Sequence, residues 1–188
     1  MISRCWRTYR WAAWAIAAVF LLATPGRTQE TPTHIPAAHG TTLAGTAIAL
    51  PDALKGRIGV LVVGFSHGSQ EQVSNWGRLI TADYGQSEGV EYFEIAMLGG
   101  APKMLRGMIL KSMRNSVPAA ERPHFLPLTE DDKPWRAVAH YDRADDAYVL
   151  LVDGDGVILW RTQGDATDAA YSALKKHLKE LPSQSGDH

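Results

Sequence analysis

The chain has 188 residues and a formal net charge of −1, with 45% hydrophobic and 21% charged residues. This length fits one globular domain with an accessory segment, and the composition excludes an intrinsically disordered chain. The near-neutral charge excludes a strongly basic nucleic-acid-binding protein.

The first 26 residues have the organisation of a secretory signal. Arg4, Arg7 and Arg10 precede an apolar run of 13 residues, 11–23, and small residues with a proline follow it. A signal peptide combines a positive end, an apolar core of about 7–15 residues and a small-residue exit, whereas a membrane-spanning helix needs about 20 apolar residues. We therefore expect export to the periplasm or cell envelope, with residues 1–26 either cleaved or retained as an N-terminal anchor.

Removal of this segment would leave a mature chain without a thiol. The single cysteine is Cys5, and residues 1–26 also hold three of the 19 basic residues and no acid, so the mature net charge is −4. Without cysteine, the mature chain has no disulfide framework, thiol redox catalysis or cysteine nucleophile. Residues 27–45 lack an apolar period and are predicted to be a linker. Residues 46–181 are predicted to form one domain, and residues 182–188 a polar tail.

The first half of this domain predicts a βαβ unit. A short strand is expected at 46–50, and the continuous apolar run at 58–65 is typical of a strand buried on both faces. Ser69 and Gln72 form a capping-box pattern that predicts the start of a helix, and 90–97 predicts a second long strand. Strand, helix and strand at this spacing indicate parallel neighbouring strands.

The second half completes a mixed sheet. In order, we expect a helix over 103–116, a weak strand at 123–128, strands at 148–153 and 157–163, and a helix over 167–181. Gly154-Asp155-Gly156 between the last two strands predicts an antiparallel hairpin. This succession predicts an α/β protein of thioredoxin-like fold, with helices on both faces of a central mixed sheet.

The turn after the first buried strand has two interpretations. Gly64-Phe65-Ser66-His67-Gly68 matches the G-x-S-x-G nucleophile elbow, which would make Ser66 the nucleophile of a serine hydrolase with Asp153 and His177. However, only about 40 mature residues precede Ser66, too few for the strands that supply half of the oxyanion hole in that fold. In addition, His177 lies on the apolar face of the predicted last helix. The hydrolase is therefore the alternative hypothesis.

In thioredoxin-like proteins, this turn carries the reactive cysteines, and the following helix N-terminus lowers their pKa. Here the turn reads Ser66-His67-Gly68-Ser69, and a hydroxyl cannot replace a thiolate in disulfide exchange. Asp145-Asp146-Ala147 stands where redox-active relatives carry a proline. We therefore expect a redox-inactive protein in which Ser66, His67 and Ser69 bind an anion or a peptide carboxylate of a partner. The alternative is that Ser69 only caps the helix and His67 faces water.

The helix predicted at 103–116 is basic and rich in methionine. Residues 95–120 contain no acid, whereas the helix carries four cations: Lys103, Arg106, Lys111 and Arg114. Such a helix suits docking to a membrane surface or to an apolar helix of another protein. The alternative, and the more frequent origin of a methionine stripe, is packing of the methionines onto the sheet. Neither a metal nor a cofactor is expected, because the seven histidines show no ligand spacing and no calcium loop is present.

Several segments resemble the thioredoxin-like assembly factors of the mitochondrial ATP synthase, the ATPase complex subunit ten family. These are 50–56, the strand at 58–65, Trp76, the basic helix with its end at Pro118, and 148–167. The resemblance covers about residues 50–181. It implies a non-enzymatic protein that helps to assemble the membrane-embedded sector of the ATP synthase and binds a newly made membrane subunit.

Two features depart from that family. The apparent secretory signal would place this chain outside the cytoplasmic membrane, and Trp160-Arg161 reverses the family's Arg-Trp order. The sequence therefore predicts a non-catalytic, exported thioredoxin-fold protein that binds a protein or membrane-associated partner, such as a subunit of a membrane complex.

Overall fold

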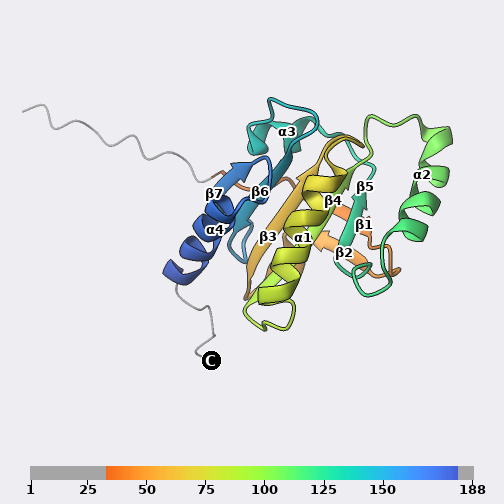
Figure 1. Ribbon diagram of the computed structural model, residues 1–188. Coiled ribbons are helices and arrows are strands. Elements are labelled where there is room, and N and C mark those ends of the chain that lie inside the picture. The colour runs from red at the N-terminus through yellow and green to blue at the C-terminus, as the bar shows by residue number, and fades with distance from the viewer. Residues whose placement is uncertain (1–32, 182–188) are drawn as a thin grey trace, which may run out of the picture. The chain divides into compact units, whose positions relative to one another are not determined.

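The computed structural model describes residues 33–181. The expected signal segment 1–26 and polar tail 182–188 lie outside the described residues. The elements in chain order are β1 (Ala38–Thr41), β2 (Ala47–Leu50), β3 (Ile58–Gly64), α1 (Gln70–Tyr84), β4 (Val90–Met97), α2 (Lys103–Ser116), β5 (Phe125–Leu128), α3 (Lys133–Ala139), β6 (Ala147–Val152), β7 (Ile158–Gln163) and α4 (Asp168–Glu180) (Figure 1). A short 3-10 helix at Asp52–Leu54 lies between β2 and β3.

Five of these strands form a mixed sheet in the order β5-β4-β3-β6-β7. Strand β3 pairs parallel with β4 and antiparallel with β6, and every residue of β3 and of β6 is buried. Burial on both faces removes any reason for polar residues to alternate, which explains the continuous apolar runs in the sequence. The predicted βαβ unit and the β6–β7 hairpin are both confirmed.

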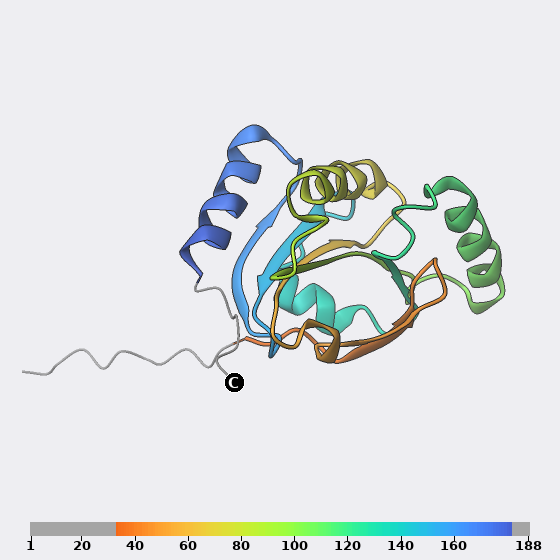
Figure 2. The ribbon, with the colours of Figure 1, turned by 90° about the horizontal axis from the view of Figure 1, so that it is seen from below.

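Helices cover both faces of the sheet. Figure 2 shows α1 and α4 on one face, and α3 with the β1–β2 hairpin on the other. On the first face, Trp76 of α1 and Leu174 of α4 pack with Val60, Val62 and other strand residues. On the second face, Trp135 of α3 packs against Leu61 and Val63. The predicted fold class is confirmed, with one hydrophobic core on each side of the sheet.

The predicted linker at 27–45 is wrong for its described part. Strand β1 lies within it and pairs antiparallel with β2, and Ile35, Ala38 and Leu43 are buried. Gly40 explains why the sequence pattern is misleading here. A Cβ at this position would lie 2.8 Å from a methyl carbon of Leu126 and 2.9 Å from one of Leu128, so the glycine permits close approach to β5. A small residue that is typical of a linker, Gly40, thus allows β1 to pack closely against β5.

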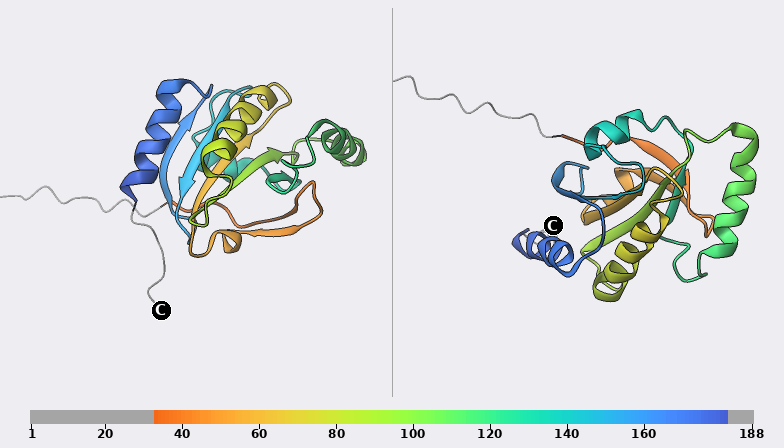
Figure 3. Two further views of the ribbon diagram at one scale, coloured as in Figure 1. Left: turned by 60° about the horizontal axis from the view of Figure 1, so that its bottom comes forward. Right: turned by 45° about the horizontal axis from the view of Figure 1, so that its top comes forward.

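Helix α2 occupies a different kind of position from the other helices. It has no buried residue, and it lies beside the β5 edge of the sheet (Figure 3). A small cluster of Leu43, Val117 and Phe125, with Met113 packed against it, joins this edge to the domain. Met104 and Met108 are exposed, so the interpretation that the methionines pack onto the sheet is wrong for these two residues. Among the described residues, no helix is long and apolar enough to span a membrane.

Candidate functional site

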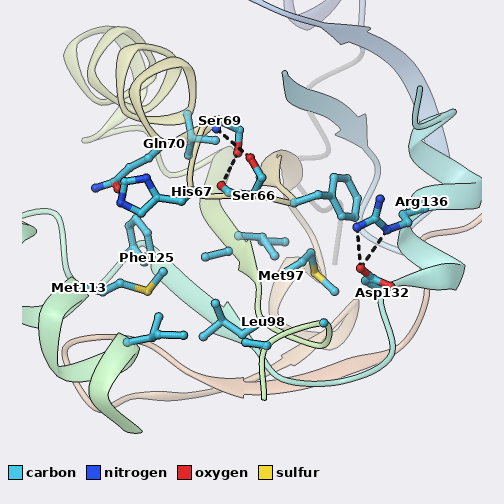
Figure 4. A pocket seen from close by; sticks show the side chains of 18 residues that line it. Ser66, His67, Ser69, Gln70, Met97, Leu98, Met113, Phe125, Asp132 and Arg136 are labelled. Carbon is cyan, nitrogen blue, oxygen red and sulfur yellow. Dashed lines mark hydrogen bonds and ion pairs between the residues drawn. The ribbon is translucent and has the colours of Figure 1, made fainter. Parts of the chain in front are cut away.

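One end of the sheet, where β3 and β4 finish, brings together the turn after β3, the end of β4 and the start of β6. Because β3 and β4 are parallel and β6 runs the other way, their carboxyl ends meet the amino end of β6. A cavity of about 300 Å³ opens there. Its lining includes Ser66, His67 and Ser69 from the turn, Ile109 and Met113 from α2, and Phe125 from β5 (Figure 4). The two segments that the sequence singled out, the turn and the basic helix, therefore border the same cavity.

The turn is held together by its two serines and by an aspartate from a distant segment. The Ser66 hydroxyl donates to Oδ1 of Asp145 at 2.7 Å and accepts from the backbone N–H of Ser69 at 3.2 Å. The Ser69 hydroxyl donates to the Ser66 carbonyl at 2.9 Å. Ser69 is buried, whereas His67 is exposed. Two residues separate Ser66 from Ser69, as in a Cys-x-x-Cys dithiol motif, but these serines serve as hydrogen-bonding groups.

The expected capping box at the start of α1 does not form. Ser69 is the N-cap residue, but its side chain makes no capping hydrogen bond because the hydroxyl points back to Ser66. Gln72 has another partner as well, since its Oε1 accepts from the backbone N–H of Ala147 at 2.8 Å. That bond ties the first turn of α1 to the start of β6.

Asp145 stands close to the N-terminus of α1. A Cβ placed on Gly68 would lie 2.2 Å from Oδ1 of Asp145, so the carboxylate is packed directly against the turn. An anionic group of a partner would meet this carboxylate, and like charges at short range repel each other. The geometry therefore opposes the interpretation of the turn as a site for an anion.

The opposite wall of the cavity carries a cation that sequence reasoning missed. Arg136 of α3 forms an ion pair with Asp132 at 2.8 Å, and its guanidinium lies 3.9 Å from the ring centre of Tyr141 and 4.9 Å from that of Phe65. The four-residue spacing of Asp132 and Arg136 could have suggested a helical ion pair. No local signal indicates the aromatic partners, because Phe65 and Tyr141 come from separate loops.

The four basic residues of α2 divide into two pairs. Arg106 donates to the carbonyls of Gly99, Ala101 and Thr129, and Arg114 donates to the carbonyl of Leu43. These two arginines hold neighbouring loops. Lys103 and Lys111 have no hydrogen bond or ion pair with any residue in the described part of the chain. Of the predicted partner-binding cations, the two lysines are those that no contact within residues 33–181 engages, whereas Arg114 is exposed and uses only its Nε.

The alternative catalytic triad is not assembled. Ser66 follows the carboxyl end of β3, whereas Asp153 follows β6 where that strand pairs with the other end of β3, near Gly59. Five residues of strand separate the two ends by about 17 Å. Asp153 instead accepts from the backbone N–H groups of Asp155 and Val157 within the hairpin turn. His177 lies on α4 beside Trp160, with 5.2 Å between ring centres. The predicted triad of Ser66, Asp153 and His177 is therefore wrong. Within residues 33–181, no cluster of three or more potential metal-ligating side chains is present.

The fold and the turn after β3 define a thioredoxin-fold protein. Its turn carries the hydroxyls of Ser66 and Ser69 where a redox-active protein carries a dithiol. Several solved structures agree on the fold. The chain is 13% identical to the exposed lipoprotein thioredoxin Etrx1 of Streptococcus pneumoniae, covering 78% of this chain and 100% of that one, with a TM-score of 0.56. It is 15% identical to an uncharacterized conserved protein of Geobacillus kaustophilus, covering 83% and 86%, with a TM-score of 0.58. It is 14% identical to BsSco, of the Sco family of cytochrome c oxidase assembly proteins, covering 80% and 96%, with a TM-score of 0.53.

A family model narrows this class. The model for the ATP10 protein family, a family of ATP synthase assembly factors, matches residues 28–181, and the chain therefore belongs to this family. The match confirms the resemblance seen in the sequence and extends it towards the N-terminus, across β1. No protein of curated function matches the chain significantly.

Proposed function

We propose that this protein assists the assembly of a membrane protein complex by binding a protein partner, without thiol chemistry. Membership of the ATP10 family over residues 28–181 is the observation that carries the proposal. The ATP synthase is the complex that the family label names. A structural neighbour, BsSco, is described as a member of a family of assembly proteins for another membrane complex, cytochrome c oxidase.

The chemistry of the turn supports binding in preference to catalysis. Residues 33–181 contain no cysteine, and the turn that would carry a dithiol holds Ser66 and Ser69. A hydroxyl is far less acidic than a thiol and does not exchange with disulfides. The hydroxyl of Ser66 is also engaged with Asp145. What the edge offers is an apolar cavity and exposed side chains, which are features of recognition sites.

The proposed binding surface combines the turn with α2. Ser66, His67 and Ser69 line one side of the cavity, and α2 forms another. Lys103 and Lys111, which pair with no residue of 33–181, extend the surface along α2, whereas Arg106 and Arg114 support it by holding loops in place.

We further propose that the protein works outside the cytoplasmic membrane. The support is the sequence of residues 1–26, which has the order of a secretory signal. Cell fractionation followed by N-terminal sequencing tests this directly. We expect the protein in the envelope fraction, either starting near residue 27 or retaining its N-terminus. Recovery of an uncleaved chain from the cytoplasm would contradict it.

A complementation experiment tests the assembly role. Cells lacking the chain should accumulate less assembled ATP synthase in their membranes, as measured on native gels, and the wild-type chain should restore it. A full-length chain carrying Cys5→Ser should restore assembly as well, because no thiol takes part. Normal amounts of the complex without the chain would refute the assembly role. Reduction of insulin disulfides by the purified protein would refute the absence of thiol chemistry.

A further inference from the structure

Large apolar side chains are exposed on α2. Met104 is 94% exposed, Met108 65% and Leu105 43%. Among the described residues, only one other large hydrophobic side chain, Leu159 of β7, is comparably exposed, at 40%. Three such side chains on neighbouring positions of one helix form a contiguous patch, whereas single exposed hydrophobic residues are ordinary.

This patch continues into the cavity. Leu105, Ile109 and Met113 are spaced by four residues and therefore form one row along the helix. Ile109 and Met113 line the cavity beside the Ser66 turn, and Met113 packs against Phe125 (Figure 4). The exposed start of α2 and the recessed cavity are thus two ends of one apolar strip. Methionine side chains are flexible and polarizable, which suits a surface that adapts to a partner.

The charge around the strip restricts what can cover it. Lys103 and Lys111 are unpaired within the described part of the chain, and no acid occurs in residues 95–120. The apolar run 11–23 of this chain follows three arginines, so that segment would bring positive charge to a positive surface. The α2 helix of a second copy would do the same. Electrostatic complementarity therefore favours an occupant that carries negative charge.

Two kinds of negatively charged occupant remain, an acidic protein segment and an anionic lipid surface. A lipid surface could contact Met104 and Met108 on the outer face of α2. It is flat on the scale of one helix, however, and would leave the cavity between α2 and the turn unfilled. A helix with an apolar row can follow the strip from Leu105 to Met113 and place a side chain in the cavity, in the manner of helix-in-groove recognition.

We propose that the α2 strip, defined as Met104, Leu105, Met108, Ile109 and Met113, binds an apolar helical segment of another protein whose flanks are acidic. This proposal rests on the proposed function and specifies the chemistry of its partner. Lys103 and Lys111 would pair with the acidic flanks, and the cavity would receive one large apolar side chain.

Two synthetic helical peptides with the same leucine row, one with glutamate and one with lysine at the flanking positions, test the proposal. Binding of each to the full-length protein is measured by fluorescence anisotropy. We expect the glutamate peptide to bind about tenfold more tightly than the lysine peptide, because attraction to two exposed lysines is replaced by repulsion. High salt should narrow this difference. Equal affinities at low salt would overturn the proposal.

Variants assign the binding to α2 and separate it from the apolar N-terminal segment, which all variants share. Met104→Asp with Met108→Asp should weaken binding of the glutamate peptide at least about tenfold, since two central apolar contacts are lost. Lys103→Glu with Lys111→Glu should reverse the preference between the peptides. The matched controls are Leu159→Asp and Lys179→Glu, which lie on β7 and α4 and should leave both affinities unchanged. Loss of binding in the controls to the same extent would overturn the proposal.

Binding to vesicles of phosphatidylcholine with phosphatidylglycerol tests the other possible occupant, an anionic lipid surface. If the α2 variants lose vesicle binding while peptide affinity is unchanged, the strip is a lipid contact and the proposal fails. The complementation experiment reads the proposed function independently. Assembly that depends on the chain but survives the α2 substitutions would refute the strip as the partner site and leave the assembly role standing.

Discussion

Helices α1 and α2 have similar amphipathic patterns but opposite roles. Trp76 and Ile80 of α1 are fully buried against the sheet, whereas α2 buries no residue at all. The difference follows from position. Helix α1 crosses over the central pair β3 and β4, while α2 lies beside the edge strand β5, where little sheet surface is left to cover (Figure 2). An apolar stripe on a helix therefore predicts a contact surface, but it does not show whether the contact is with the chain's own sheet or with another molecule.

The largest expected effect is on the stability contributed by α1. Trp76→Ala should lower the free energy of unfolding by about 3–5 kcal/mol, because it removes a fully buried ring and leaves a cavity. It also removes the hydrogen bond from Nε1 of Trp76 to the carbonyl of Gly164. The matched change Met108→Ala on α2 should alter stability by less than about 0.5 kcal/mol. Urea denaturation measures both, and equal losses would show that α2 is core.

The next effect concerns Glu94, which lies under α1. Burial raises the pKa of Glu94 from its ordinary 4.5 to about 8, and the charge of Glu121 adds to the rise. The folded state therefore binds more protons than the unfolded state between pH 4.5 and 8, and stability falls as pH rises through this window. Glu94→Gln should remove a pH-dependent loss on the order of 4 kcal/mol. Urea denaturation at several pH values gives the free energy of unfolding of the wild type and of Glu94→Gln. The same pH dependence in both proteins would contradict the prediction.

Glycines on the two helices provide a smaller and sharper contrast. A Cβ on Gly77 of α1 would lie 2.0 Å from Oε1 of Glu94, so Gly77→Ala should cost about 1–3 kcal/mol through overpacking. A Cβ on Gly107 of α2 would meet no atom within 4 Å. Gly107→Ala should therefore stabilise the protein by up to about 1 kcal/mol through helix propensity. Thermal unfolding measures whether each substitution raises or lowers stability. Destabilisation by Gly107→Ala would mean that α2 packs more closely than described.

The smallest effect is at the turn that begins α1. Ser66→Ala removes the hydrogen bond to Asp145 and should cost about 1 kcal/mol. Asp145→Ala removes the same bond, so the double variant should lose little more than either single one. Additive losses in this double-mutant cycle would show that the two side chains are not coupled.

Much of the fold follows from local pattern, and the exceptions have physical causes. The buried strands β3 and β6 are visible as apolar runs because both of their faces are covered. Strand β1 is not visible, because Gly40 is selected for close approach to β5 and reads as a turn residue. The face of α2 can be predicted from its period, but whether that face is covered depends on how far the sheet extends.

The candidate site could be predicted only in part. The turn and the basic helix stand out in the sequence, and the structure brings them to one cavity. Asp145 and Arg136 were missed because their roles come from tertiary contacts, with Ser66 and with the rings of Phe65 and Tyr141. Likewise, the sequence shows four equivalent cations on α2. Only the structure distinguishes the arginines bound to carbonyls from the two lysines, which have no partner in the described part of the chain.

The most direct test of the α2 strip is to map where the glutamate peptide contacts the protein. Backbone amide NMR shifts recorded during titration of the full-length chain report contact residue by residue. The account predicts that the changes concentrate on α2 and on the Ser66–Ser69 turn, with α4 and β7 unaffected. Changes concentrated on α4 and β7, or none on α2 when the peptide is bound, would contradict it.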